Sequence, residues 1–289
     1  MKTISQLIIT MMICLFSIQT WAQSGKLFNT DNQLSSNLAT QVFQDKSGFI
    51  WIATRNGLNN YDGYHINVIK KDMSNFLGLN SNYINSIAQD EKEHILLGTN
   101  NSLLEFTGSE FLKIPMLDSK GKELATYVKQ VYPLKNKDVA VATSGYGIML
   151  KKQDEQKCHA MKGEVEKLKY IHKLLEDKRG RLWIITEDGK LYRKETNGRV
   201  TSHFVGTEGV DAQDIQQDAL GNIYLASKNQ GVHLLRAGSN VFTRISNIGN
   251  LPIDNIYISR NNKLYIGCDG LGIYVYDPQT GFLQDNPLF

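Results

Sequence analysis

The fold is decided by Gln44-Asp45-Lys46-Ser47-Gly48-Phe49-Ile50-Trp51-Ile52-Ala53-Thr54, because this stretch of sequence recurs along the chain. Residues 176–186 and 217–227 repeat it closely, and three weaker copies lie elsewhere. The central residues of the six copies occupy positions 51, 96, 140, 183, 224 and 265, so the steps between them are 45, 44, 43, 41 and 41 residues. So steady a period is typical of propellers and solenoids.

Each copy divides into four short strands separated by turn residues. In the first copy we expect strands at 39–44, 49–54, 58–61 and 65–69. The Asp45 to Gly48 turn suits a hairpin, because Asp bonds its own backbone and Gly tolerates positive φ. Apolar runs fit strands that are buried on both faces. Four-stranded blades packed radially form a β-propeller, so the sequence predicts an all-β fold.

The six blades are expected at approximately 34–72, 79–115, 125–161, 168–205, 210–246 and 251–285, within a propeller domain that covers 23–289. A helical repeat is the alternative, but a 3.6-residue period is weak even at 163–175, which we interpret as a linker with a turn of helix. The positions that define the repeat are Asp45, Gly48, Trp51, Thr54, Gly57, Asp177, Gly180, Trp183, Thr186, Asp218 and Gly221.

The ends of the repeat region suggest that the ring is incomplete. Residues 26–30 resemble an outermost strand that lacks three inner partners, and blade six has its own outer strand near 281–283. We therefore favour a seven-bladed ring whose remaining strands would lie beyond Phe289. The alternative is a six-bladed ring closed by the terminal strands. An open ring would leave sheet edges and blade faces exposed.

The N-terminal segment has the pattern of a signal peptide, residues 1–22. Lys2 precedes an apolar run at 7–18, and small residues stand before an expected cleavage after Ala22. The run is shorter than a bilayer-spanning helix of about 20 residues, so a periplasmic location is expected. The mature chain would carry a formal charge of +2, one less than the +3 of the whole sequence. This net charge is too small to indicate the basic surface that a nucleic-acid-binding protein usually has, so we expect no nucleic-acid partner.

The repeat resembles the two-component regulator propeller repeat, through residues 34–37, 44–54, 56–58 and 61–63. The resemblance implies the periplasmic sensor part of a hybrid two-component system of Bacteroidetes, which senses glycan fragments. It also implies as partners a second propeller or the remaining receptor chain, and a homodimer in the full receptor. The chain has no kinase motif, so it would be a fragment or a truncated product. Blades three and six depart from the pattern, since 134–137 and 259–262 replace the Asp-turn-Gly.

Catalysis finds no positive support in the residues. The six histidines have no HxH or HExxH spacing, and no paired carboxylates or arginine cluster suggest a glycosidase. We therefore expect no catalytic residues, no metal and no cofactor. Cys158 and Cys268 lie far apart in the sequence and at different positions within their copies of the repeat, which favours unpaired structural roles. A secreted lyase or hydrolase of the streptogramin lyase type stays as the alternative, as does a non-functional receptor remnant, because fold alone cannot decide function.

Ligand binding is better supported, because propellers bind at the mouth of the central channel. The loops between second and third strands, and those that enter each innermost strand, lie at that mouth. They offer amides, charges and one aromatic ring. Such groups hydrogen-bond hydroxyls and stack on a sugar ring, so we expect an oligosaccharide ligand. Trp51 and Trp183, by contrast, are expected to pack within blades. The candidate ligand-binding residues are Arg55, Asn56, Asn100, Asn101, Tyr146, Glu187, Asp188, Lys228, Asn229, Gln230 and Asp269.

Overall fold

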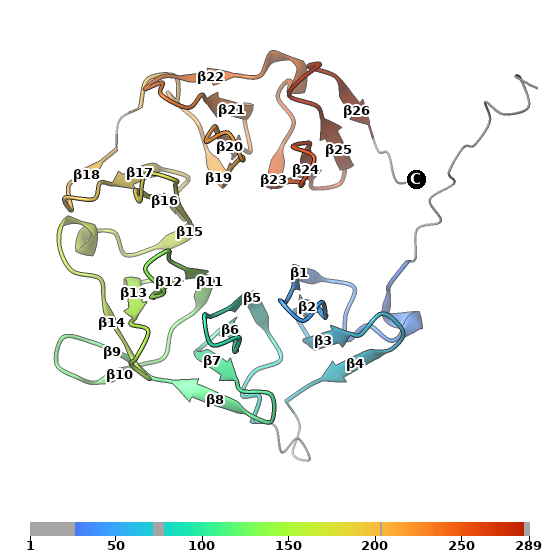
Figure 1. Ribbon diagram of the computed structural model, residues 1–289, viewed down its shortest axis with the longest axis vertical. Coiled ribbons are helices and arrows are strands. Elements are labelled where there is room, and N and C mark those ends of the chain that lie inside the picture. The colour runs from blue at the N-terminus through green and yellow to red at the C-terminus, as the bar shows by residue number, and fades with distance from the viewer. Residues whose placement is uncertain (1–26, 72–77, 203, 286–289) are drawn as a thin grey trace, which may run out of the picture.

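The computed structural model describes residues 27–71, 78–202 and 204–285. Six antiparallel blades follow one another around a ring, each with its innermost strand first in sequence (Figure 1). This confirms the predicted all-β propeller and its six blades. The predicted signal peptide lies outside the described residues. In the part of the chain that the structure describes, no helix is long and apolar enough to cross a membrane.

The strands of the first three blades are β1 (Ala39–Gln44), β2 (Ile50–Thr54), β3 (Gly57–Tyr61) and β4 (Ile66–Ile69); β5 (Ile84–Gln89), β6 (Ile95–Thr99), β7 (Leu103–Phe106) and β8 (Phe111–Ile114); and β11 (Val128–Pro133), β12 (Val139–Thr143), β13 (Gly147–Lys151) and β14 (Cys158–Ala160). The strands of the last three are β15 (Ile171–Glu176), β16 (Leu182–Thr186), β17 (Leu191–Lys194) and β18 (Val200–Thr201); β19 (Ala212–Gln217), β20 (Ile223–Ser227), β21 (Gly231–Leu235) and β22 (Phe242–Arg244); and β23 (Ile253–Ile258), β24 (Leu264–Cys268), β25 (Gly272–Tyr276) and β26 (Leu283–Asp285).

Two short strands add to the third blade beyond the predicted four. They are β9 (Met116–Leu117) and β10 (Glu123–Leu124), and β9 pairs in parallel with β14 at the outer edge. The sequence pattern missed them because each is only two residues long. Three 3-10 turns complete the described elements: η1 (Thr30–Asn32), η2 (Glu164–Lys167) and η3 (Ser246–Ile248). The second turn lies in the 163–175 stretch, where a turn of helix was expected. The interpretation of that whole stretch as a linker is wrong, because residues 171–175 belong to the innermost strand β15.

The Asp-turn-Gly motif joins the first two strands of a blade in the way the sequence indicated. At Asp45 the backbone carbonyl accepts from the Gly48 N–H at 3.0 Å, and Oδ1 accepts from the Phe49 N–H at 2.9 Å. Glycine is required at the end of this turn because φ is +94° there. Asp177 and Asp218 form the same bonds with residues three and four positions further on.

Neighbouring blades are joined by apolar packing and by one repeated hydrogen bond. The central strands β6, β12, β16 and β20 are buried along their whole length, and their side chains form the core clusters between sheets. On four of the innermost strands, one polar side chain bonds the backbone of the next innermost strand. The bonds are Gln41 to Ile87, Ser86 to Val131, Gln130 to Leu174 and Asp214 to Ile256, over 2.6–3.1 Å.

The ring is open between blade six and blade one (Figure 1). Val42 in β1 has 62% of its surface exposed, whereas Ile87 and Leu174 at the same repeat position are 1% exposed. On the other side of the opening, Tyr257 in β23 is also 62% exposed. Both faces therefore lack the neighbouring sheet that buries their counterparts.

The expected outermost strand at 26–30 is wrong for its described residues. Residues 27–29 form no strand, and the 3-10 turn η1 begins at Thr30. Residues 27–29 belong to none of the described sheets, so this segment does not form the strand that would close the ring. Cys158 and Cys268 are buried and unpaired, which agrees with the structural role expected for them.

Candidate functional site

One repeated backbone contact gathers the loops at a single face of the ring. The residue that follows the second strand donates its N–H to the carbonyl of the residue that precedes the innermost strand. This contact joins Arg55 to Leu38, Asn100 to Tyr83, Ser144 to Tyr127, Glu187 to Tyr170 and Lys228 to Asp211, over 3.0–3.3 Å. The residues before and after the paired strand ends therefore lie together at the mouth of the channel.

Side chains from four blades form a continuous series across this mouth, which we term the mouth ladder: Arg55, Tyr83, Tyr127, Lys129 and Glu187. The Arg55 guanidinium lies 5.7 Å from the centre of the Tyr83 ring, and the Tyr83 and Tyr127 rings lie 5.9 Å apart, edge to face. The Lys129 ammonium lies 4.7 Å from the centre of the Tyr127 ring and 3.5 Å from the Glu187 carboxylate.

The surroundings of Tyr127 in the ladder keep its phenol neutral. Burial raises the pKa of Tyr127, and the neighbouring Tyr83 phenol and the Glu187 charge raise it further. The Tyr127 hydroxyl donates a 2.8 Å hydrogen bond to Oδ1 of Asn85, which fixes the ring. Burial likewise lowers the pKa of His172 on β15, and the charges of Lys173 and Lys129 add to this effect. The mouth therefore presents the neutral Tyr127 ring beside the Lys129 ammonium.

A cavity of about 810 Å³ lies between blades four and five, next to the Glu187 end of the ladder. Its walls carry charged groups, including Asp188, Lys190 and Glu208, and the rings of Tyr192 and Phe204. A smaller pocket of about 450 Å³ is lined by Glu187, Asp188 and Tyr192, so it adjoins both the ladder and the cavity. Both volumes lie in the range found for binding sites of small organic ligands.

The structure separates the predicted ligand-binding residues into three groups. Arg55 and Glu187 belong to the mouth ladder, and Asp188 lines both pockets. Five others support turns through their side chains or backbone: Asn100, Asn101, Lys228, Asn229 and Gln230. The side chains of Asn229 and Gln230 bond the carbonyls of Gly209 and Glu208, so they hold the cavity wall. Exposed turns carry the remaining three, Asn56, Tyr146 and Asp269.

Sequence reasoning missed Tyr83, Tyr127 and Lys129, which form the middle of the ladder. A signal for the two tyrosines was present, because Tyr83, Tyr127 and Tyr170 occupy the same repeat position, directly before the innermost strands of blades two, three and four. Lys129 was harder to predict from the sequence. It lies at a bulge in the pairing of β11 with β12, and the bulge changes the direction of its side chain from that expected for a regular strand.

The structure also gathers Asp90, His94 and Glu105, whose potential metal-binding atoms lie within 4.8 Å of one another. Sequence reasoning treated His94 as isolated, because Glu105 comes from a different strand. The His94 Nδ1 lies 3.2 Å from the Glu105 carboxylate and 3.9 Å from that of Asp90. These carboxylates pair with the imidazole, and this pairing accounts for the cluster without an ion.

Family comparison agrees with the repeat. Residues 33–56, 78–101 and 167–188 match the two-component regulator propeller model, and these segments are repeats of that family. The resemblance inferred from the sequence is thereby confirmed. A search of curated proteins found no match.

Solved structures share the fold over most of the chain. The extracellular domain of a putative hybrid two-component system, BT3049 of B. thetaiotaomicron, has a TM-score of 0.76 and 24% identity over 89% of this chain and 36% of that one. The domain of the putative one-component system BT4673 from the same organism has a TM-score of 0.71 and 18% identity, over 87% and 36%. The present chain thus spans about a third of the length of these domains.

Propeller enzymes have the same fold. A virginiamycin B lyase of Staphylococcus aureus, solved with quinupristin, has a TM-score of 0.67 and 12% identity over 91% of this chain and 88% of the lyase. At these identities the comparisons define the fold, and function depends on the site.

Proposed function

We propose that the chain is a ligand-sensing propeller of an extracytoplasmic receptor, with an oligosaccharide bound at the channel mouth and no catalytic role. The observation that carries the proposal is the mouth ladder. Its two tyrosine rings lie between a guanidinium and an ammonium, and its charged end, Glu187, lines the smaller pocket that adjoins the cavity between blades four and five.

The chemistry of the ladder suits a polyhydroxylated ligand. An aromatic ring offers a flat apolar face to the C–H groups of a sugar, while Arg55, Lys129 and Glu187 can bond its hydroxyl groups. Several sugar units are needed to follow the ladder from blade one to the cavity. An oligosaccharide therefore fits the arrangement better than a single sugar does.

The exposed faces of blades one and six suggest how binding is communicated. Val42 and Tyr257 lie where other blades have a packed neighbour, so we propose that further β-sheet of the receptor, or its second propeller, packs there. A ligand that contacts blades one to five at the mouth would stabilise one arrangement of these blades, and thereby one packing at the opening.

The test is a thermal unfolding screen of the full chain after export and processing, with and without a panel of neutral and charged oligosaccharides. A ligand that binds only the folded state raises the unfolding temperature. We expect one structural class of glycan to do so in a saturable manner. If no glycan in the panel shifts the transition, while another compound class does, the oligosaccharide assignment is wrong.

The same samples separate a sensor from a propeller lyase or hydrolase. Each glycan that binds is incubated with the protein and its products are analysed by mass spectrometry. Intact glycan after prolonged incubation supports a sensor. Turnover that is lost on substitution of His172 or Glu187 would instead assign an enzyme, since an imidazole and a carboxylate are common general acids and bases and both lie near Lys129 of the ladder.

A further inference from the structure

A second polar pocket lies on the opposite face of the ring, between the Asp-turn of blade four and the hairpins of blade five. It has a volume of about 160 Å³. The first turn contributes Lys178, Arg179 and Arg181, and the turn between β21 and β22 contributes Arg236. None of the residues that line the pocket is an aspartate or a glutamate.

Most of this positive charge has no neutralising partner. Arg181 donates from Nε to Asp177 at 2.7 Å, and Lys178 donates from Nζ to the carbonyl of Ala219. Within the described ranges, no carboxylate lies within ion-pair distance of Arg179 or Arg236. Four cations therefore line one small pocket. Lys178, Arg179 and Arg236 are exposed to solvent and Arg181 is partly buried, so together they form a positively charged recess that attracts anions.

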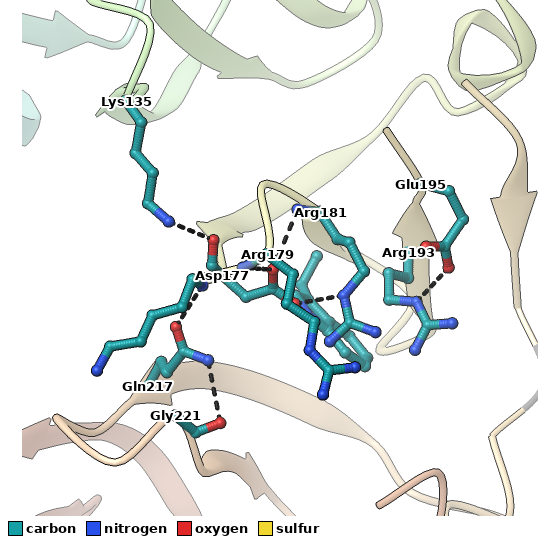
Figure 2. Close-up of polar contacts among 10 residues, drawn as sticks. Lys135, Asp177, Arg179, Arg181, Arg193, Glu195, Gln217 and Gly221 are labelled. Carbon is teal, nitrogen blue, oxygen red and sulfur yellow. Dashed lines mark hydrogen bonds and ion pairs between the residues drawn. The ribbon is translucent and has the colours of Figure 1, made fainter. Parts of the chain in front are cut away.

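The turn that carries the cations is held in place by a network of hydrogen bonds (Figure 2). The Asp177 side chain accepts from the backbone N–H of Arg179 and of Arg181 through Oδ1, at 2.9 and 3.0 Å. On the blade-five side, the Gln217 side chain accepts from the Lys178 N–H at 2.7 Å and donates to the Gly221 carbonyl at 3.1 Å. These bonds fix the turn that carries three of the cations.

Aromatic stacking further limits the motion of the guanidinium groups. The Arg181 side chain is only 16% exposed, and its guanidinium lies 5.6 Å from the Trp183 ring centre. In Figure 2 the Arg179 and Arg181 side chains extend in the same direction from their turn. A planar guanidinium held in this way presents its remaining N–H groups to an anion with little further loss of entropy.

From this geometry we propose that the pocket binds a tetrahedral oxyanion, a sulfate or phosphate group. Arg179, Arg181 and Arg236 donate to its oxygens from two adjacent blades, and Lys178 contributes charge. Such a group can come from the free inorganic ion or from an ester on a sugar. The site lies on the face opposite the mouth ladder and does not depend on the proposed function.

Calorimetric titration of the full chain with sodium sulfate, sodium phosphate, N-acetylglucosamine 6-sulfate and unsulfated N-acetylglucosamine tests the proposal. Ionic strength is held constant with sodium chloride. We expect saturable binding of sulfate or phosphate, weakened about tenfold or more in the variant Arg179→Ala/Arg236→Ala, because this variant removes two of the three guanidinium groups that would donate to the anion. The control Arg199→Ala/Arg260→Ala removes the same charge from equally exposed positions that do not line the pocket, and should bind as wild type does.

The titrations with the two sugars show whether the bound sulfate or phosphate group is a free ion or an ester on a sugar. Stronger binding of the sulfated sugar than of free sulfate, with none by the unsulfated sugar, indicates an ester ligand, whereas binding of the free ions alone indicates an inorganic anion. Selenate, soaked into crystals, should give an anomalous peak between Arg179 and Arg236. The variant Arg179→Glu is a second test that keeps Arg236. Its carboxylate repels an anion, so it should also weaken the binding of sulfate or phosphate. Absence of saturable binding, or equal weakening in the control variant, would overturn the proposal.

Discussion

The indole Nε1 of Trp183 donates a 2.8 Å hydrogen bond to Oδ2 of Asp177, six residues earlier, and both side chains are fully buried. Trp51 and Asp45 form the same bond at 2.8 Å in the first blade. This contact fixes the turn of the repeat against the strand that follows it. In blade four the same carboxylate also binds Arg181, so it supports both the fold and the cationic pocket.

Replacement of this carboxylate should strongly destabilise the propeller. Asp177→Asn leaves Arg181 half-buried without its counter-ion and weakens the bond to Trp183, so we expect a loss of about 3–5 kcal/mol in the free energy of unfolding. Asp188→Asn is the matched control, because its partner Lys190 is exposed and such pairs contribute at most about 1 kcal/mol. Urea unfolding of both variants measures the difference, and equal losses would contradict the account.

The contribution of Asp177 should depend on pH. Burial alone would raise the pKa of this carboxyl, but the hydrogen bonds from Trp183 and Arg181 outweigh burial and lower it. Because the folded-state pKa is below the unfolded value of about 3.9, the stabilisation is fully present above that value. It is lost as the pH falls through the folded-state pKa. The stability gap between wild type and Asp177→Asn should therefore shrink below about pH 4; a gap that is constant down to pH 2 would exclude this linkage.

Gly231 should tolerate no side chain, for a reason beyond its backbone angle. Its φ is +70°, and an added Cβ would lie 2.1 Å from the carbonyl oxygen of Gly249. Gly238 has a similar φ of +85° but open space around it. We expect Gly238→Ala to cost about 1–2 kcal/mol and Gly231→Ala about 2 kcal/mol more, because a clash is added to the same backbone strain. Thermal denaturation compares the two, and similar losses would show that no close approach exists.

Because the ring is open, Leu174 and Val42, which occupy the same repeat position, should contribute differently to the free energy of unfolding. Leu174→Ala should destabilise the isolated chain by about 2–5 kcal/mol, since Leu174 is 1% exposed between blades. Val42→Ala should change stability by less than about 0.5 kcal/mol, because Val42 is 62% exposed. Chemical denaturation measures both. A large loss at Val42 would mean that this face is covered in solution by another part of the chain or by a second copy.

The sequence predicted the elements that repeat and failed where a single copy departs from the pattern. The turn at Asp45 and the buried strand around Trp51 were identified because three good copies show the same residues. The short strands β9 and β10 belong to one blade only, so no period could mark them. The absence of a strand at 27–29 depends on a missing partner sheet, which is a tertiary property.

The sequence predicted on which face of the ring the candidate site lies, but it did not predict most of the residues that form the site. Arg55 and Glu187 were found because the loops of a propeller converge at the mouth. Asn100 and Asn101 were chosen for the same reason, but their side chains satisfy hydrogen bonds of their own turns. Tyr83 and Tyr127 meet across two blades, 44 residues apart in sequence, so only the packing of those blades reveals that their rings are in contact.

The central claim is that the mouth ladder binds a glycan, and the most direct measurement is the affinity of the best glycan for Tyr127→Ala. Calorimetric titration should show a loss of more than about tenfold relative to wild type, as expected for an aromatic group at the centre of a binding site. Tyr127→Phe should retain most of the affinity, because the ring remains, and Tyr64→Ala, at a tyrosine that is 84% exposed outside the ladder, should retain all of it. A folded Tyr127→Ala protein whose affinity stays within about twofold of wild type would contradict the account.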